Sequence, residues 1–495
     1  MAERTSGGPE QFPGSVLDLL EEAGERAVFE HAGRAVSGSR LLASVRRAAT
    51  GLREHGVGPG DGVAMLLGAG PGPFAAVIAA HVVGARVVGL RQGLTPRQEH
   101  RLVSDVVCTV TDRAGAADVL GPVPALALAD LLSAPDRAVR PQVTARPQDV
   151  ARLIHTSGST GEPKACAQTY AAMTAGWALR PGVWPPAIRE LASRLDRFLV
   201  FGTLASQVML EYGLLTLAAG GVLVTADAAD LHGALVRHRA TASVITVARL
   251  AKLVAQVRES PGGTDRPRAL MVSGSPPPPG LLREAAEVLG PVVFHGYGQT
   301  ETGMISMAAP WEAPGSLGVP PVDLEIRDPC GRLVPTGTDG EIFVRTPGQG
   351  CGYWGDPALT AEVFVDGWVR TRDVGHLDAE GRLWLTGRTR DIVIVNANVH
   401  YTGPVERLLT GHPAVAEAYA VAAPDDSTGE AVHAFVVPAA GPGALPTLEE
   451  VRALVAAELG EACAPVRLTP IDEVPLTAAG KPDKQRLADR ARGRA

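Results

Sequence analysis

One ten-residue stretch combines residue types that bind phosphate. It reads Thr156-Ser157-Gly158-Ser159-Thr160-Gly161-Glu162-Pro163-Lys164-Ala165 and follows a short apolar run. Its glycines let backbone N–H groups turn toward an anion because no Cβ blocks the approach, and its hydroxyl groups add neutral donors. Lys164 adds a mobile positive charge for the outer phosphates of a nucleotide. The stretch is therefore interpreted as a phosphate loop, although a solvated Gly/Ser loop has similar composition, and the spacing is not that of a P-loop.

The phosphate loop resembles that of the adenylate-forming ligases, a family that includes acyl-CoA synthetases, peptide-synthetase adenylation domains and luciferases. Further motifs of this family follow in the expected order over the remaining two-thirds of the chain. The resemblance implies that ATP and Mg²⁺ are used to convert a carboxylic acid into an acyl adenylate with release of pyrophosphate. A nucleophile then takes the acyl group. A non-enzymatic ATP-binding relative is the alternative, but Lys164, Glu301 and Lys481 are all retained.

Two glycine-containing turns resemble the nucleotide motifs of this family. The first is Gly274-Ser275-Pro276, which lies against adenine and the acyl group in the family, although it also reads as a strand ended by proline. The second is Gly296-Tyr297-Gly298-Gln299-Thr300-Glu301-Thr302-Gly303. The resemblance implies that Tyr297 stacks on adenine, that Thr300 hydrogen-bonds the α-phosphate, and that Glu301 holds Mg²⁺, a hard ion that prefers oxygen ligands. A helix N-terminus capped by Glu301 is the alternative.

The resemblance assigns the ribose to two charged residues near the end of the large domain. Asp373 lies in a stretch that matches the family except that Arg372 stands in the usual glycine position. An ionised carboxylate accepts hydrogen bonds only, which suits the two ribose hydroxyls, and Arg388 is expected to assist. A surface ion pair is the alternative. The stretch Gly387-Arg388-Thr389-Arg390-Asp391 resembles the family's domain boundary and places Asp391 at its hinge position.

A lysine near the C-terminus resembles the catalytic lysine of the family. Lys481 follows Gly480, as in the family motif, and is one of four lysines in the chain. A point charge on a flexible stem can bridge the substrate carboxylate and the α-phosphate and stabilise the charge that develops as pyrophosphate departs. An exposed tail lysine is the alternative for Lys481. We expect Lys484 to be a surface residue.

The middle of the chain bears on the identity of the acid. Peptide-synthetase domains usually carry an Asp here for the amino group of their substrate, and many acyl-CoA synthetases carry a His. Residues 197–212 contain neither. An uncharged aryl or medium-length acyl acid is therefore expected rather than an α-amino acid. The resemblance places the acyl pocket near Phe201, Ala205, Thr246, Ala248 and Gly303.

The acceptor of the acyl group is expected to be coenzyme A, because most stand-alone relatives use this thiol. One departure favours an amine instead, which would give an amide without coenzyme A. Where the family often has a glycine lining the pantetheine tunnel, this chain has Asn396-Ala397 in an unbroken register from Asp391 to Glu406. Transfer to a carrier-protein thiol is a third possibility.

Composition excludes several other classes of protein. The net charge of −7 and the pI near 6.0 argue against nucleic-acid binding. The longest apolar run, residues 74–90, contains His81, Gly84 and Arg86 and predicts a buried helix and strand rather than a membrane span. Five scattered cysteines suggest no zinc site and fit a reducing, cytoplasmic environment.

The 495 residues are enough for more than one domain. Apolar strands alternate with amphipathic helices through most of the chain, which predicts an α/β fold with mostly parallel sheets covered on both faces. The Pro- and Ala-rich segment 121–150 is expected to be a connection. The resemblance implies a large AMP-binding domain at 1–386, a hinge at 387–391 and a small mobile α+β domain at 392–495 that carries the catalytic lysine.

Overall fold

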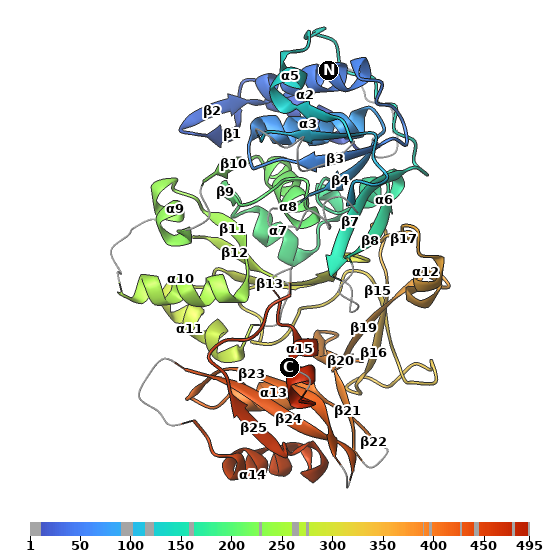
Figure 1. Cartoon of the computed structure of the whole chain (residues 1–495). Coiled ribbons are helices and arrows are strands. Elements are labelled where there is room, and N and C mark those ends of the chain that lie inside the picture. Colours follow the sequence, from blue (N-terminus) through green and yellow to red (C-terminus); the bar gives the residue numbers. More distant parts are fainter. Residues whose placement is uncertain are drawn as a thin grey trace.

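The computed structural model has a large N-terminal domain and a smaller C-terminal domain, shown at the top and bottom of Figure 1. Its description covers twelve ranges of the chain. These are 11–90, 102–113, 123–157, 163–226, 230–259, 267–273, 277–389, 391–395, 398–425, 428–439, 445–477 and 481–493.

The first sheet of the large domain carries the phosphate loop. Its strands are, in spatial order, β17 (Gly352–Tyr353), β8 (Pro163–Thr169), β7 (Val150–Ser157), β4 (Arg86–Gly89), β3 (Gly62–Leu66), β5 (Cys108–Thr111) and β6 (Ala125–Ala127). The strands from β7 to β6 pair in parallel, whereas β7–β8 and β8–β17 are antiparallel. This sheet therefore ends in an antiparallel edge that begins at the phosphate loop.

The second sheet carries the Gly296–Gly303 motif. Its strands are β14 (Gly303–Ala308), β13 (Val293–Gln299), β12 (Ala269–Val272), β11 (Ala242–Ile245), β9 (Arg197–Val200), β10 (Val222–Thr225), β1 (Ala27–His31) and β2 (Arg34–Ser37). Only the β13–β14 and β1–β2 pairs are antiparallel among these. Both sheets thus confirm the predicted mostly parallel arrangement.

Helices cover these sheets because their apolar residues recur at helical spacing and need a partner surface. The helices associated with the first part of the chain are α1 (Gly14–Ala23), α2 (Gly38–Glu54), α3 (Pro71–Val82), α5 (Leu128–Ser133) and α6 (Tyr170–Ala175). Those of the second part are α7 (Pro186–Ala192), α8 (Gln207–Ala218), α9 (Leu231–Arg237), α10 (Val247–Glu259) and α11 (Pro279–Leu289). A short 3₁₀ turn spans Pro181–Val183. The largest fully buried side chains of the shared core include Phe29, Phe74, Tyr170 and Phe198.

A third, antiparallel sheet completes the large domain and leads to the predicted hinge. It contains β15 (Asp323–Arg327), β16 (Gly340–Arg345), β19 (Trp368–Leu377) and β18 (Phe364–Val365), with β20 (Leu383–Arg388) paired to β19. Helix α12 (Pro357–Val363) precedes β18. The register aligns Asp373 of β19 with Arg388 of β20, so the two predicted ribose residues lie on neighbouring strands.

The C-terminal domain is a mixed sheet with helices, as the predicted α+β class requires. Its strands are β22 (Asn398–Tyr401), β21 (Ile392–Val395), β24 (Gly429–Pro438) and β23 (Val415–Asp425), with β25 (Arg467–Pro470) parallel to β24. Its helices are α13 (Thr402–Thr410), α14 (Leu448–Leu459) and α15 (Lys484–Ala491), with a 3₁₀ turn at Glu461–Cys463. A separate hydrophobic cluster fills this domain, while the exact domain boundaries remain a prediction.

Two expectations about local structure were wrong. The segment expected to be a connection contains β6 and α5, because Leu128 and Leu131 turn a short helix toward the core. The apolar pattern also predicts a helix over 16–27, but α1 ends at Ala23, since Gly24 adopts a φ of +51° that stops the helix. The helix predicted within 95–103 falls mostly outside the described residues.

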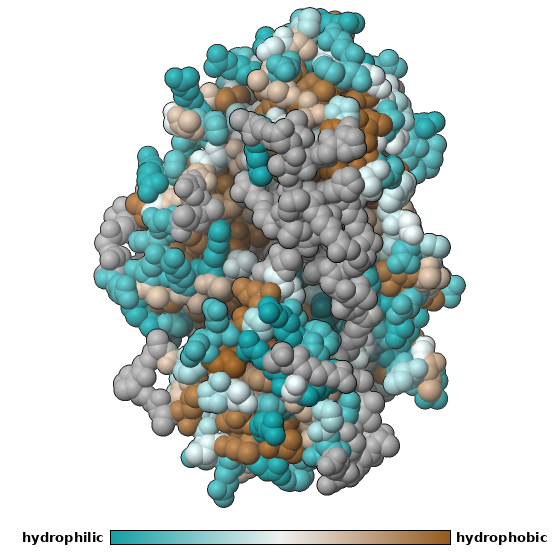
Figure 2. Space-filling view, viewed as in Figure 1, coloured by the Kyte–Doolittle hydropathy of each residue, from teal (hydrophilic) through white to brown (hydrophobic). Residues whose placement is uncertain are grey.

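Within the described ranges, none of the helices combines the length and apolar character that crossing a bilayer would take. On the face shown in Figure 2, hydrophilic side chains are spread over the upper and lower parts of the molecule.

The β13–β14 hairpin depends on one glycine, which generates a test of its packing. A Cβ on Gly298 would lie 2.3 Å from the backbone oxygen of Gly303, so the two strands would have to separate. We expect Gly298→Ala to lower the free energy of unfolding by about 1–3 kcal/mol. Gly280→Ala is the matched control, because a Cβ there meets nothing within 4 Å. Equal denaturant midpoints for the two variants would contradict this description of the hairpin.

Candidate active site

The β7–β8 hairpin presents the predicted phosphate loop. Its last register pairs are Thr156 with Lys164 and Ser157 with Pro163, so both ends of the loop are fixed by strand pairing. Lys164 begins the strand that leaves the loop and is half-buried. The described residues stop at 157 and resume at 163, and the predicted phosphate contacts of Gly158, Ser159, Thr160 and Gly161 lie outside them.

The second nucleotide motif forms the hairpin between β13 and β14, with Thr300, Glu301 and Thr302 at the turn. The alternative in which Glu301 caps a helix is therefore wrong. The hydroxyl of Tyr353 donates a hydrogen bond to Oε1 of Glu301. Burial and the adjacent Glu301 carboxylate raise the pKa of Tyr353, so this tyrosine stays a hydrogen-bond donor at neutral pH.

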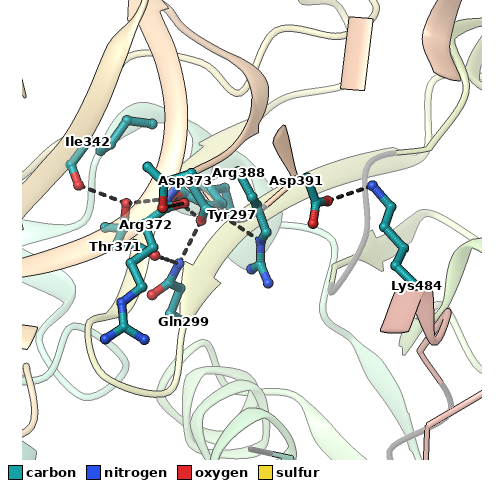
Figure 3. A network of polar contacts seen from close by, with 10 residues as sticks. Tyr297, Gln299, Ile342, Thr371, Arg372, Asp373, Arg388, Asp391 and Lys484 are labelled. Carbon is teal, nitrogen blue, oxygen red and sulfur yellow. Dashed lines mark hydrogen bonds and ion pairs between the residues drawn. The ribbon is translucent and has the colours of Figure 1, made fainter. Parts of the chain in front are cut away.

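Asp373 is the centre of a polar network (Figure 3). Asp373 is buried, with only 3% of its surface exposed. Its Oδ2 accepts hydrogen bonds from the Tyr297 hydroxyl at 2.7 Å and from Nε2 of Gln299 at 2.6 Å. Its Oδ1 accepts from Nε of Arg388 at 2.7 Å. The network therefore links β13, β19 and β20. The alternative of a surface ion pair does not describe it, because the Asp373 side chain is only 4% exposed, although that of Arg388 is 60% exposed.

The position where the family has glycine keeps a left-handed backbone in this chain. Arg372 has a φ of +61°, a conformation that side chains other than glycine rarely adopt. Its backbone oxygen accepts the N–H of Thr389 at 2.8 Å, and its guanidinium pairs with Glu362 at 2.6 Å. The tight connection beside Asp373 is therefore retained without glycine.

Lys481 approaches the same network from the C-terminal domain. The residue is exposed, yet the pKa of Lys481 is lowered, first by the protein surrounding its amino group and then by the positive charge of Arg388. The carboxylates of Asp373 and Glu301 act in the opposite direction. These effects place the Lys481 amino group within electrostatic range of all three large-domain residues.

The loop that carries Lys481 is closed by its own backbone. Thr477 N–H donates to the oxygen of Lys481 at 2.7 Å, and Asp483 N–H donates to the oxygen of Pro475 at 2.7 Å. Residues 478–480 lie outside the described part of the chain. The lysine is thus presented from a hairpin-like loop rather than from a free tail.

Lys484 is not the surface residue that the sequence suggested. Its Nζ lies 2.5 Å from Oδ2 of the predicted hinge residue Asp391 (Figure 3). It also lies 2.8 Å from Oε1 of Glu406. The three side chains are only 18–26% exposed. Two carboxylates that would repel one another are therefore held together by one ammonium group at the start of the C-terminal domain.

The residues predicted for the acyl pocket separate into two groups. Ala205 lies against Gly89 at the end of β4, and Gly303 faces Nε2 of Gln207. In contrast, Phe201 packs into a core beneath α10 with the Arg249 guanidinium 4.9 Å from its ring centre. The other two predicted residues, Thr246 and Ala248, lie at the start of α10 and are exposed. The pocket assignment stays a prediction for all five.

Gly296 lies where β13 passes α8. A Cβ at this position would lie 3.5 Å from the hydroxyl of Tyr212, whose ring packs edge-on against Trp177. Tyr297 is buried on the opposite side of the strand with its hydroxyl on Asp373, and its stacking on adenine stays a prediction. The Gly274-Ser275-Pro276 turn lies outside the described residues, between β12 and α11.

Three functional contacts escaped the sequence reasoning. The Gly352-Tyr353-Trp354 segment resembles a family motif that the sequence suggests is structural, a loop bordering the site, so the bond from the Tyr353 hydroxyl to Glu301 was missed. The Lys484 ion pairs and the Gln299 side-chain bond to Asp373 were also missed. The only available signal was the scarcity of lysine, which singled out Lys484 without showing its partners.

The donor set fits a magnesium nucleotide. In the described parts of the chain no group of three or more His, Cys, Asp or Glu residues could enclose a metal ion. Glu301, the predicted magnesium ligand, would supply one hard oxygen donor, which suits an ion that keeps several waters and is otherwise held by substrate phosphates. Lys164 and Lys481 are predicted to supply positive charge to the nucleotide.

Comparison with known proteins agrees with this geometry. A family model described as AMP-binding enzyme matches residues 20–354, and one described as AMP-binding enzyme C-terminal domain matches residues 404–481. The first match alone covers more than half of the chain. The chain therefore belongs to the AMP-binding enzyme family and is an AMP-forming ligase.

Three similar proteins illustrate the range of this family. A feruloyl-CoA synthase from Amycolatopsis is 31% identical over 468 residues, covering 91% of this chain and 93% of the relative. The amide bond synthetase McbA from Marinactinospora thermotolerans is 34% identical, with a TM-score of 0.87 and coverage of 96% of this chain and 99% of McbA. The o-succinylbenzoate coenzyme A synthetase from Bacillus subtilis, in complex with ATP and magnesium, is 25% identical, with a TM-score of 0.80 and coverage of 97% and 100%.

The ion pairs of Lys484 generate a stability prediction. Lys484→Met leaves Asp391 and Glu406 side by side without their shared cation. We expect the free energy of unfolding to fall by up to about 3 kcal/mol, the low end for a broken buried pair, because the side chains keep some exposure. Thermal denaturation of the full chain measures this, with Lys252→Met on exposed α10 as control. A loss no larger than that of the control would show that the pairs do not stabilise the domain.

Proposed function

We propose that this protein activates a carboxylic acid with ATP and transfers the acyl group to a small-molecule acceptor. The proposal is supported by the polar network that joins Tyr297, Asp373 and Arg388, and by the lowered pKa of Lys481, which responds to the charges of Arg388, Asp373 and Glu301. The first half-reaction needs a mobile cation beside the bound nucleotide, because negative charge accumulates on the phosphate oxygens as pyrophosphate departs.

The reaction assigns a task to each side chain. The acid's carboxylate oxygen forms a bond to the α-phosphorus while the bond to pyrophosphate breaks. Lys481 stabilises the charge on the reacting oxygens, Lys164 and the phosphate loop hold the outer phosphates, and Thr300 hydrogen-bonds the α-phosphate. Bound Mg²⁺, held by Glu301, would neutralise phosphate charge. Asp373 and Arg388 orient the ribose.

The acid is proposed to be an uncharged aryl or medium-length acyl acid. No Asp or His occurs at residues 197–212 to meet an amino group or another charge on the substrate. If the acyl pocket lies where it is predicted, Ala205 and Gly303 would give it small side chains, and the aromatic pair Tyr212–Trp177 packs next to Gly296. This surface supports an aromatic or apolar acyl group rather than an α-amino acid.

Coenzyme A is the first candidate acceptor. The similarity to a feruloyl-CoA synthase and to an o-succinylbenzoate coenzyme A synthetase supports it. The thiolate would attack the acyl carbon of the adenylate and release AMP. A carrier-protein thiol would react in the same way.

An amine is the second candidate acceptor. It is supported by the similarity to the amide bond synthetase McbA over almost the full length of both chains. It is also supported by Asn396-Ala397 in place of the glycine that lines the family's pantetheine tunnel. An amine attacks the same acyl carbon but needs no pantetheine tunnel, so side chains at Asn396 and Ala397 would not hinder the transfer of the acyl group to an amine.

Mass spectrometry distinguishes these acceptors. The protein is incubated with ATP, Mg²⁺ and a panel of aryl and alkyl acids, each with coenzyme A, with a simple amine, or with neither. We expect acyl-AMP with neither acceptor for at least one acid. A thioester formed only with coenzyme A identifies an acyl-CoA synthetase, and an amide formed without it identifies an amide synthetase. ATP cleavage to ADP would contradict the proposal.

Lys481→Ala tests the catalytic lysine. We expect acid-dependent pyrophosphate release to fall about 100- to 1,000-fold, because one charge-stabilising group is removed from the transition state. Supplied acyl-AMP should still react with the acceptor, since that step does not break the bond to pyrophosphate. The two half-reactions are measured separately by chromatography. Equal losses in both would remove the assigned role.

Ala397→Gly tests the tunnel argument. If the side chain narrows the path of the pantetheine arm, the variant should use coenzyme A several-fold better than the parent, measured as kcat/KM for thioester formation. Its rate of acyl-AMP formation should not change, which serves as the internal control. An unchanged rate with coenzyme A would show that this residue does not restrict the thiol.

A further inference from the structure

Tyr353 connects the two nucleotide motifs of the large domain. It lies on β17, which pairs with β8, the strand that leaves the phosphate loop. Its register partner is Cys166, two residues after Lys164. Its side chain reaches away from that strand to donate a hydrogen bond to Oε1 of Glu301 on the β13–β14 turn.

The backbone around Tyr353 is fixed on both sides. Cys351 N–H donates to the oxygen of Ala167, and Trp354 N–H donates to the oxygen of Ala165, both at 2.8 Å. The N–H of Tyr353 itself donates to Oγ1 of Thr360 at 2.8 Å. The ring packs edge-on against Phe364 with 5.9 Å between ring centres. The hydroxyl is therefore presented from a rigid position.

The same segment holds the backbone of the β13–β14 turn. Gly350 N–H donates to the oxygen of Glu301 at 2.8 Å, and Oγ1 of Thr346 donates to the oxygen of Thr302 at 2.6 Å. Glycine is needed at 350, since a Cβ there would lie 2.7 Å from the sulfur of Cys166. Segment 346–353 thus fixes both the main chain and the carboxylate of Glu301.

We propose that Tyr353 is a positioning residue that orients the Glu301 carboxylate for the magnesium nucleotide and couples it to the phosphate loop. The inference rests on the proposed function. The Tyr353 bond occupies Oε1, and no hydrogen bond or ion pair between described residues uses Oε2, which leaves that oxygen available to a hard cation. A carboxylate that binds a metal is commonly held by a hydrogen bond of this kind.

Tyr353→Phe removes the hydroxyl and keeps the ring that packs against Phe364. We expect about tenfold weaker binding of ATP in the presence of Mg²⁺, because a hydrogen bond to a charged group is lost. Binding of AMP, and of ATP in EDTA, should stay within twofold of the parent, since neither needs the oriented carboxylate. Isothermal titration calorimetry measures all three. The Mg²⁺ concentration for half-maximal pyrophosphate release should rise by a similar factor.

Tyr419→Phe is the matched control. It removes the same hydroxyl from a similar bond, to Glu417 at 2.6 Å in the C-terminal domain, and it should change none of these values. Glu301→Gln provides a second background, in which adding Tyr353→Phe should have no further effect on binding of magnesium ATP.

The outcomes separate the inference from the proposed function. An equal loss of affinity for AMP and for magnesium ATP in Tyr353→Phe would assign the tyrosine a purely structural role and overturn the inference. Unchanged binding of both would overturn it as well, and so would an additive loss in the Glu301→Gln background. If the parent protein binds neither nucleotide, the proposed function fails instead.

Discussion

The site depends on one buried carboxylate, that of Asp373. A buried charge is stable only when its hydrogen-bonding capacity is satisfied, and Asp373 meets this condition through donors from β13 and from β20. The bonds hold the nucleotide hairpin against the sheet that leads to the hinge. Arg388 is three residues before Asp391, so the pairing of Asp373 fixes the end of β20 just before the predicted hinge.

The junction with the C-terminal domain is fixed by short contacts of the same kind. A Cβ on Gly403 would lie 2.6 Å from the oxygen of Thr386, so α13 begins almost in contact with β20. The N–H of Thr402 donates to the oxygen of Asp391 at 2.9 Å, and Lys484 neutralises the Asp391 side chain. In this arrangement the pKa of Lys481 responds to the charges of Arg388, Asp373 and Glu301, as expected if this lysine acts in the proposed acid activation. Transfer to an acceptor would need the hinge to move.

The sequence predicted the sheets and the main motifs well because these depend on local patterns. Apolar runs, helical spacing and glycine-rich turns are readable over a few residues. It could not predict contacts set by tertiary structure. Tyr353 reaches a carboxylate 52 positions away, and Lys484 reaches one 93 positions away, with no spacing rule to link them. Similarly, no spacing rule predicts that Phe201 packs into the cluster beside α10 with the Arg249 guanidinium 4.9 Å from its ring centre.

The central claim is that this chain joins a carboxylic acid to the α-phosphate of ATP. Isotope exchange between labelled pyrophosphate and ATP, measured across the panel of acids without any acceptor, tests this most directly because it reports the reverse of acyl-AMP formation. The account predicts incorporation of label into ATP that requires both Mg²⁺ and at least one of the acids. Labelling of ATP that occurs equally well without any acid would contradict it. A failure to label ATP with every acid of the panel would contradict it as well.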